Sequence, residues 1–66
     1  MRPKVSFDSK HIGRRIEICQ IVARAHGWGS REIAAFTQEV TRAFSYEEAM
    51  EIIDREFDTI LVRFGP

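Results

Sequence analysis

The fold is decided by residues 45–64, which read SYEEAMEIIDREFDTILVRF. Their apolar side chains recur at steps of three, four and one, which is the spacing of one face of an α-helix. On a wheel with about 100° per residue they fall within roughly 60° of one line, opposite an acidic face. The stripe consists of Tyr46, Ala49, Met50, Ile53, Phe57, Ile60, Leu61 and Phe64. The spacing predicts a helix over residues 45–64, which begins with a capping box of Ser45 and Glu48 and buries one side.

The motif Gly27-Trp28-Gly29 interrupts the apolar periodicity earlier in the chain. Gly27 suits the left-handed position that follows a helix, and Ser30 suits the N-cap of the next helix. The sequence therefore predicts two further helices, at residues 8–26 and 30–44.

These elements predict an all-α fold, a small three-helix bundle in a single domain of residues 1–66. Within this domain, residues 1–7 precede the helices as a short extended arm, in which Val5 and Phe7 alternate with polar side chains as in a strand. Pro3 restricts this arm to a sheet edge or a tail. The first helix is apolar over more than half its circumference, so we expect it to pack against two neighbours, and a homodimer would complete the bundle. The predicted core comprises Ile16, Cys19, Ala23, Ile33, Phe36, Val40, Phe44, Met50, Ile53, Phe57 and Leu61.

Size and composition exclude several classes of protein. At 66 residues the chain is near the lower limit for a hydrophobic core without disulfides or metal. An apolar content of 44% and ten basic against ten acidic residues exclude a disordered tail and a uniformly polybasic nucleic-acid binder. One cysteine permits no internal disulfide, and the sequence has neither the apolar core of a signal peptide nor a membrane span. We therefore expect a cytoplasmic protein that does not contact a membrane.

Charge is divided between the two halves of the chain. Residues 1–31 contain seven basic and two acidic residues, a net charge of +5, whereas residues 32–66 contain three basic and eight acidic residues, a net charge of −5. Attraction between the halves, within one fold or across a dimer, is the favoured interpretation, and the alternative is a basic surface that meets an anionic partner.

Residues that carry catalytic or metal-binding chemistry are sparse. Cys19 and His26 share a helical face, but two turns place them roughly 10 Å apart along the axis, too far for a direct hydrogen bond. Zinc binding by Cys19, His26 and His11 would need a fourth ligand and a closure that helical spacing does not provide. The acidic face of the last helix lies opposite its apolar stripe and is expected to be solvated. We therefore expect no enzymatic activity, no cofactor and no metal.

A protein-interaction module is the function that the sequence favours, because apolar surface exceeds what three short helices bury. The expected interface residues are Trp28, Ile18, Ile21, Ile52 and Val62. Tryptophan contributes strongly to interfaces. For Trp28 the favoured interpretation is that it covers the end of the core between the first two helices, and an interface anchor is the alternative.

A DNA-binding regulator is the alternative function. The order of an alternating segment, a helix, a glycine-containing turn and a second helix resembles ribbon-helix-helix repressors. The resemblance implies that Arg2, Lys4 and Ser6 read bases from a strand pair of a dimer, while the amides of Gly29 and Ser30 hold a phosphate. A helix-turn-helix interpretation of residues 27–44 is weaker, since its recognition helix has only two basic residues.

The run HGWGSREIAAFTQEVTRAFSYEEAMEIIDREFD, residues 26–58, also resembles a pattern of small uncharacterised proteins of bacteriophages and prophages. That resemblance implies an accessory protein in the host cytoplasm, which binds and inhibits a host protein. It places the protein-interaction hypothesis above the DNA-binding one.

Overall fold

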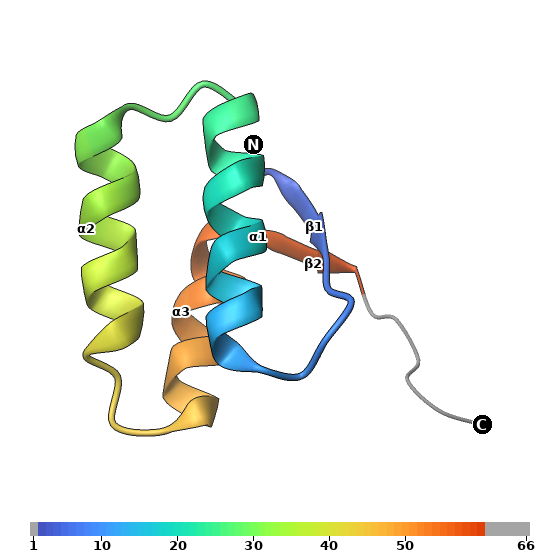
Figure 1. Ribbon diagram of the computed structural model, residues 1–66, viewed down its shortest axis with the longest axis vertical. Helices are drawn as coiled ribbons and strands as arrows, with labels where there is room; N and C mark the ends of the chain where they lie inside the picture. The colour runs from blue at the N-terminus through green and yellow to red at the C-terminus, as the bar shows by residue number, and fades with distance from the viewer. Residues whose placement is uncertain (1, 61–66) are drawn as a thin grey trace.

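The chain, in a computed structural model that describes residues 2–60, forms three helices and two short strands. The helices are α1 (Ile12–Ala25), α2 (Ser30–Thr41) and α3 (Tyr46–Glu56), and the strands are β1 (Lys4–Ser6) and β2 (Asp58–Ile60). Successive helices run in opposite directions, and the strands lie together on one side of them (Figure 1). The predicted three helices are confirmed, but the fold is mostly helical rather than all-α.

The two strands pair in parallel, with Val5 opposite Thr59. The amide of Asp58 donates a hydrogen bond of 2.8 Å to the carbonyl oxygen of Pro3, just before the paired residues. Val5 and Phe7 are buried, with 2% and 4% of their surfaces exposed. The predicted extended arm therefore contains a strand whose apolar side chains belong to the core, and these two core residues were missing from the prediction.

The helix predicted over residues 45–64 is wrong for residues 57–60, because α3 ends at Glu56. Phe57 has extended backbone angles, φ −128° and ψ 148°, and its side chain is fully buried. Thr59 and Ile60 are β-branched and favour a strand, and the main chain of β1 supplies the hydrogen bonds of that strand. Leu61, and the rest of the predicted helix to residue 64, lie outside the described residues.

Gly27 ends α1 as predicted, with a positive φ of 99°. The amides of Gly27 and Trp28 donate to the carbonyls of Arg24 and Ala23 at 3.2 and 3.0 Å, which is the Schellman arrangement. The predicted N-cap of the next helix is off by one residue, because Gly29 is the N-cap of α2 and Ser30 is its first helical residue.

The first helix begins at Ile12 rather than at residue 8. The hydroxyl of Ser9 accepts a hydrogen bond of 3.1 Å from the amide of His11, and this local turn holds the chain out of the helix. Asp8 lies outside α1 and forms an ion pair of 3.0 Å with Arg14 in its first turn. A carboxylate close to a helix N-terminus is favourable.

The second helix ends at Thr41, and Phe44, predicted to lie in the core, is 96% exposed. The next helix begins where predicted: the hydroxyl of Ser45 accepts a hydrogen bond of 3.1 Å from the amide of Glu48. Phe44 therefore lies in a turn between two helices and not on the apolar face of the second.

The core lies between the three helices and the strand pair. It contains Val5, Phe7, Cys19, Ala23, Ile33, Phe36, Val40, Ala49, Ile53 and Phe57, while Ile16 and Met50, which were predicted to be in it, are only partly buried against it. Cys19, Ala23, Ile53 and Phe57 have no exposed surface. No buried side-chain polar atom lacks a hydrogen-bond partner in the part of the chain that the structure describes.

Candidate interaction surfaces

Trp28 packs against the core. Its ring stacks on that of Phe57 at a centroid distance of 5.2 Å and meets the edge of Phe36 at 6.0 Å. Phe36 and Phe57 contact one another at 5.2 Å, so the three rings form one aromatic cluster. The structure therefore supports the interpretation of Trp28 as a residue that covers the end of the core after α1.

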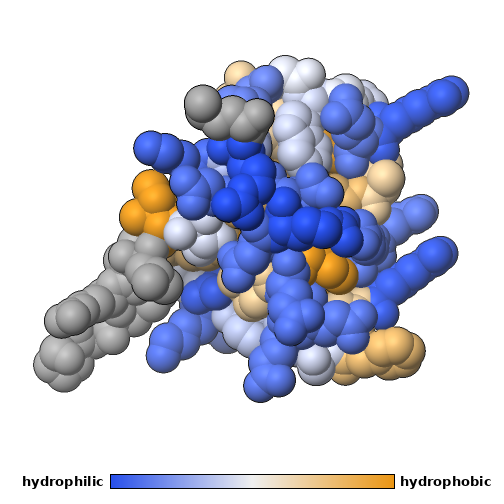
Figure 2. All heavy atoms as spheres, turned by 180° about the vertical axis from the view of Figure 1, so that it is seen from behind, coloured by the Kyte–Doolittle hydropathy of each residue, from blue (hydrophilic) through white to orange (hydrophobic). Residues whose placement is uncertain are grey.

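The other predicted interface residues that the structure describes lie on two different helices. Ile18 and Ile52 are partly buried against the core from two different helices, α1 and α3. Ile21, also on α1, is 56% exposed. Val62 lies outside the described residues. Figure 2 shows the molecule from behind as a mostly hydrophilic surface with separate small apolar areas, rather than a continuous apolar face.

Phe44, in the turn between α2 and α3, and Tyr46, the first residue of α3, are both exposed, and we call the two residues the aromatic turn. Their exposed fractions are 96% and 44%. Phe44 is the residue before the N-cap, where a hydrophobic side chain usually packs on the fourth helical residue, here Ala49. Because Phe44 is almost fully exposed, it does not make this contact. Sequence reasoning missed this site, since the apolar spacing of the second helix had assigned Phe44 to the core.

Arg15 contacts Tyr46, the second residue of the aromatic turn. Its guanidinium carbon lies 5.7 Å from the centre of the Tyr46 ring and 4.9 Å from that of Phe7. Its Nε donates a hydrogen bond of 2.8 Å to the carbonyl oxygen of Ser9. The cation therefore lies in contact with both rings and favours one orientation of the Tyr46 side chain.

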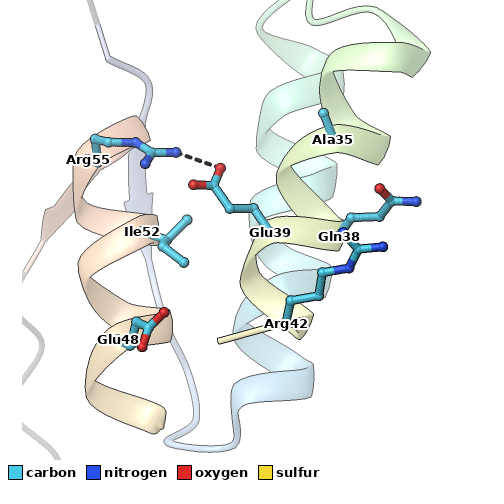
Figure 3. A pocket seen from close by; sticks show the side chains of 7 residues that line it. All are labelled: Ala35, Gln38, Glu39, Arg42, Glu48, Ile52 and Arg55. Carbon is cyan, nitrogen blue, oxygen red and sulfur yellow. Dashed lines mark hydrogen bonds and ion pairs between the residues drawn. The ribbon is translucent and has the colours of Figure 1, made fainter. Parts of the chain in front are cut away.

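A shallow groove runs between α2 and α3, and we call it the α2–α3 groove. It is lined by Ala35, Gln38, Glu39, Arg42, Glu48, Ile52 and Arg55. Arg55 donates to Glu39 across it at 2.7 Å, and Ile52 points from α3 toward α2 (Figure 3). The hydrogen bond from Arg55 lowers the pKa of Glu39, and the same bond raises the pKa of Arg55.

Between residues 2 and 60, no ion pair joins the basic half of the chain to the acidic half. Within residues 2–60, each of the four ion pairs joins two residues of the same half: Asp8–Arg14, Arg14–Glu17, Glu39–Arg55 and Arg55–Glu56. A contact between the halves comes from Arg2, whose guanidinium donates to the carbonyl oxygen of Asp54 near the end of α3. The predicted attraction between the halves is thus not carried by direct ion pairs of the described residues.

The residues that the DNA-binding hypothesis assigns to bases and phosphate lie apart. Lys4 and Ser6 are exposed on either side of buried Val5, but their strand pairs with β2 of the same chain and in parallel. The amide of Gly29 donates to Glu32 Oε1 at 3.2 Å. A carboxylate therefore occupies the position next to Gly29 and Ser30 where a phosphate would bind, which disfavours that role.

Cys19 is fully buried, and burial raises the pKa of its thiol to about 12. A thiol of this kind is inert, because the nucleophile is the thiolate. Residues 2–60 contain no group of three or more His, Cys, Asp or Glu side chains placed to hold a metal ion. No helix within that range is long and apolar enough to cross a membrane.

Comparison of the chain with protein-family models, with curated proteins and with solved structures finds no match in any of the three.

Proposed function

We propose that the chain is a non-enzymatic protein-interaction module that binds a host protein through the aromatic turn. The observation that carries this proposal is Phe44, a large apolar side chain that is 96% exposed. Aromatic residues, phenylalanine among them, are enriched in protein interfaces, where burial removes their apolar surface from water.

The turn is held in place on both sides. Before it, the amide of Ala43 donates to the carbonyl of Val40 at 3.2 Å, and after it the hydroxyl of Ser45 accepts from the amide of Glu48 at 3.1 Å. A partner that receives Phe44 therefore does not have to order the main chain first, and more of the burial energy becomes affinity. Full burial of a phenylalanine side chain contributes about 2–3 kcal/mol, a factor of roughly 30–150 in the dissociation constant.

The partner that fits this surface offers an apolar pocket for Phe44 with an aromatic or polar rim for Tyr46. The resemblance to phage and prophage proteins supports a host regulator, enzyme or defence protein as that partner, encountered in the cytoplasm and inhibited or modulated by binding. Full burial of Cys19 supports a role without catalysis, because the one thiol of the chain does not reach the surface. We propose further that the chain forms a homodimer, as its small size favours.

The experiment is an affinity capture from bacterial lysate with three baits, each run with and without nuclease. The baits are the wild type, Phe44→Asp and the matched control Ala34→Asp, which places the same charge on an exposed apolar site of α2 that belongs to none of the proposed interfaces. We expect a host protein that the wild type and Ala34→Asp retain after nuclease treatment, and that Phe44→Asp loses.

Two outcomes contradict the proposal. If all three baits retain the same proteins, the aromatic turn is not the binding surface. If the wild type retains nucleic acid, or only proteins that nuclease removes, the protein is a nucleic-acid binder instead. Once a partner is identified, calorimetry with purified proteins should show an affinity at least about tenfold weaker for Phe44→Asp than for the control.

A further inference from the structure

Four charged side chains surround the α2–α3 groove with alternating sign. Arg55 and Glu39 lie toward one end of it. Glu48 lies toward the other end, where the side chain of Arg42 also begins before it extends along α2, away from α3 (Figure 3). Along α3 the negative Glu48 precedes the positive Arg55, and along α2 the negative Glu39 precedes the positive Arg42. Because the two helices run in opposite directions (Figure 1), each charged residue has one of opposite sign across the groove and another further along its own helix.

Two of the residues that line the groove are apolar, Ala35 and Ile52. Ala35 contributes a single methyl group from α2, and Ile52 contributes a partly buried aliphatic side chain from α3. Small residues allow another helix to approach closely, and the charged rim would surround the contact, as in the polar rim of protein interfaces.

We infer that the occupant of this groove is a second copy of the chain, related by a two-fold axis that runs along the groove. This inference rests on the homodimer proposed above and assigns its surface. Such an axis places α2 of one protomer over α3 of its partner and forms a four-helix arrangement with antiparallel neighbours. Arg42 then meets Glu48 of the partner subunit, and Glu48 meets Arg42 of the partner subunit.

The unequal pairing of the four charges selects this axis. Arg55 and Glu39 already form an ion pair within the chain at 2.7 Å, whereas none of the ion pairs of residues 2–60 includes Arg42 or Glu48. An axis across the groove would instead bring Arg42 to Glu39 of the partner subunit, a carboxylate that already has a partner. The axis along the groove gives a partner to both unpaired side chains, one from each helix.

Glu48 is available for this contact because its side chain is not needed at the start of α3. The cap there is the bond from the main-chain amide of Glu48 to the hydroxyl of Ser45, which does not involve the carboxylate. Figure 3 shows the carboxylate on the groove side of α3. Replacing it therefore leaves the cap hydrogen bond in place.

The test is sedimentation velocity of the full chain from about 5 to 500 μM at low salt, a range that covers weak dimers. The variants are Arg42→Glu, Glu48→Arg, an equal mixture of the two, and the double variant. Matched controls reverse exposed charges outside the groove, Arg31→Glu on α2 and Glu47→Arg on α3. Circular dichroism confirms that each variant is folded.

We expect the wild type and both controls to dimerise. Each single variant converts two attractive contacts into two repulsive ones, so its dissociation constant should rise at least about tenfold. In the mixture, and in the double variant, opposite charges face each other again, and dimerisation should return.

Three results overturn the inference, and they differ from one another. If the wild type is monomeric throughout the range, the proposed homodimer fails together with its surface. If it dimerises and the single variants match the controls, the dimer stands but uses another face. If the single variants are monomeric and the mixture remains so, the groove is involved but Arg42 and Glu48 do not face each other.

Discussion

The substitution Val5→Ala tests whether the strand pair is part of the folded core. The sequence pattern allows a tail at this position, for which truncating the side chain would cost nothing. In the structure Val5 is 2% exposed and lies opposite Thr59 in the strand pair. A tail and a packed strand at these residues therefore predict different free energies of unfolding for Val5→Ala.

The expected loss follows from the burial of the side chain. Alanine lacks two of the methyl groups of valine, and at about 0.8 kcal/mol for each buried carbon group plus a cavity contribution, the loss is about 2 kcal/mol. A chain of 66 residues has a free energy of unfolding of about 3–10 kcal/mol. The melting temperature should therefore fall by about 8–15 °C, a large effect for one substitution outside the helices.

Urea unfolding provides the measurement, because the fluorescence of the one tryptophan reports on the core. Trp28 stacks on Phe57 at 5.2 Å, and this contact is lost on unfolding. Lys4→Ala, on the same strand but exposed, is the control and should change stability by less than about 0.5 kcal/mol. If Val5→Ala and Lys4→Ala unfold at the same urea concentration, the strand does not pack as described, and the N-terminal segment is a tail.

Three further predictions concern caps, a turn and the thiol. Ser45→Ala should lower the free energy of unfolding by about 1 kcal/mol in urea titrations, whereas Ser30→Ala, which removes no cap hydrogen bond, should change it by only a few tenths. Gly27→Ala should be destabilising by about 1–2 kcal/mol because the φ of Gly27 is 99°, although a Cβ there meets no atom. Gly13→Ala, within α1, should be stabilising by up to about 1 kcal/mol. Equal effects of the two substitutions in thermal melts would contradict this. Burial raises the pKa of the Cys19 thiol from 9.0 to about 12, so with rising pH the thiol loses its proton in the unfolded chain before it does in the folded chain. The free energy of unfolding should therefore be constant below about pH 8 and should fall as the pH rises from 9 toward 12. Replacing Cys19 with Ala should remove that dependence, and a native thiol that reacts with a disulfide reagent as fast as the unfolded chain would contradict its burial.

The helical part of the fold follows from local signals that act within one turn. Gly27 is the residue with positive φ, and Ser45 is the N-cap of α3, both as the sequence predicts. Such signals depend on neighbouring residues alone, since a left-handed position favours glycine and a hydroxyl satisfies a free amide wherever the helix lies. Ser30 shows the limit of this reasoning, because the chain enters α2 one residue earlier, with Glu32 bonding the amide of Gly29.

The strand pair could not be predicted from the same signals, because it joins residues more than fifty positions apart. Phe57 continues the apolar spacing of α3 and is buried, so the pattern is the same whether the helix continues or ends there. What distinguishes the two is the hydrogen bond from the amide of Asp58 to Pro3, a contact that no local pattern contains. Short strands are specified by their partner more than by their own residues.

Phe44 is the position where sequence reasoning fails in an informative way. Two independent local rules assign it to the interior: it continues the stripe of Ile33, Phe36 and Val40, and it precedes the N-cap Ser45, where an apolar side chain normally packs on the helix. The structure follows neither rule, and the side chain is 96% exposed. Local rules are broken mainly at functional or strained sites, so a phenylalanine that violates two of them marks a candidate binding site. The α2–α3 groove violates no such rule, because Arg42 and Glu48 are ordinary surface residues of their helices. The aromatic turn is therefore the surface that the fold of a single chain leaves unexplained, and the groove is the surface whose charges fit a second copy.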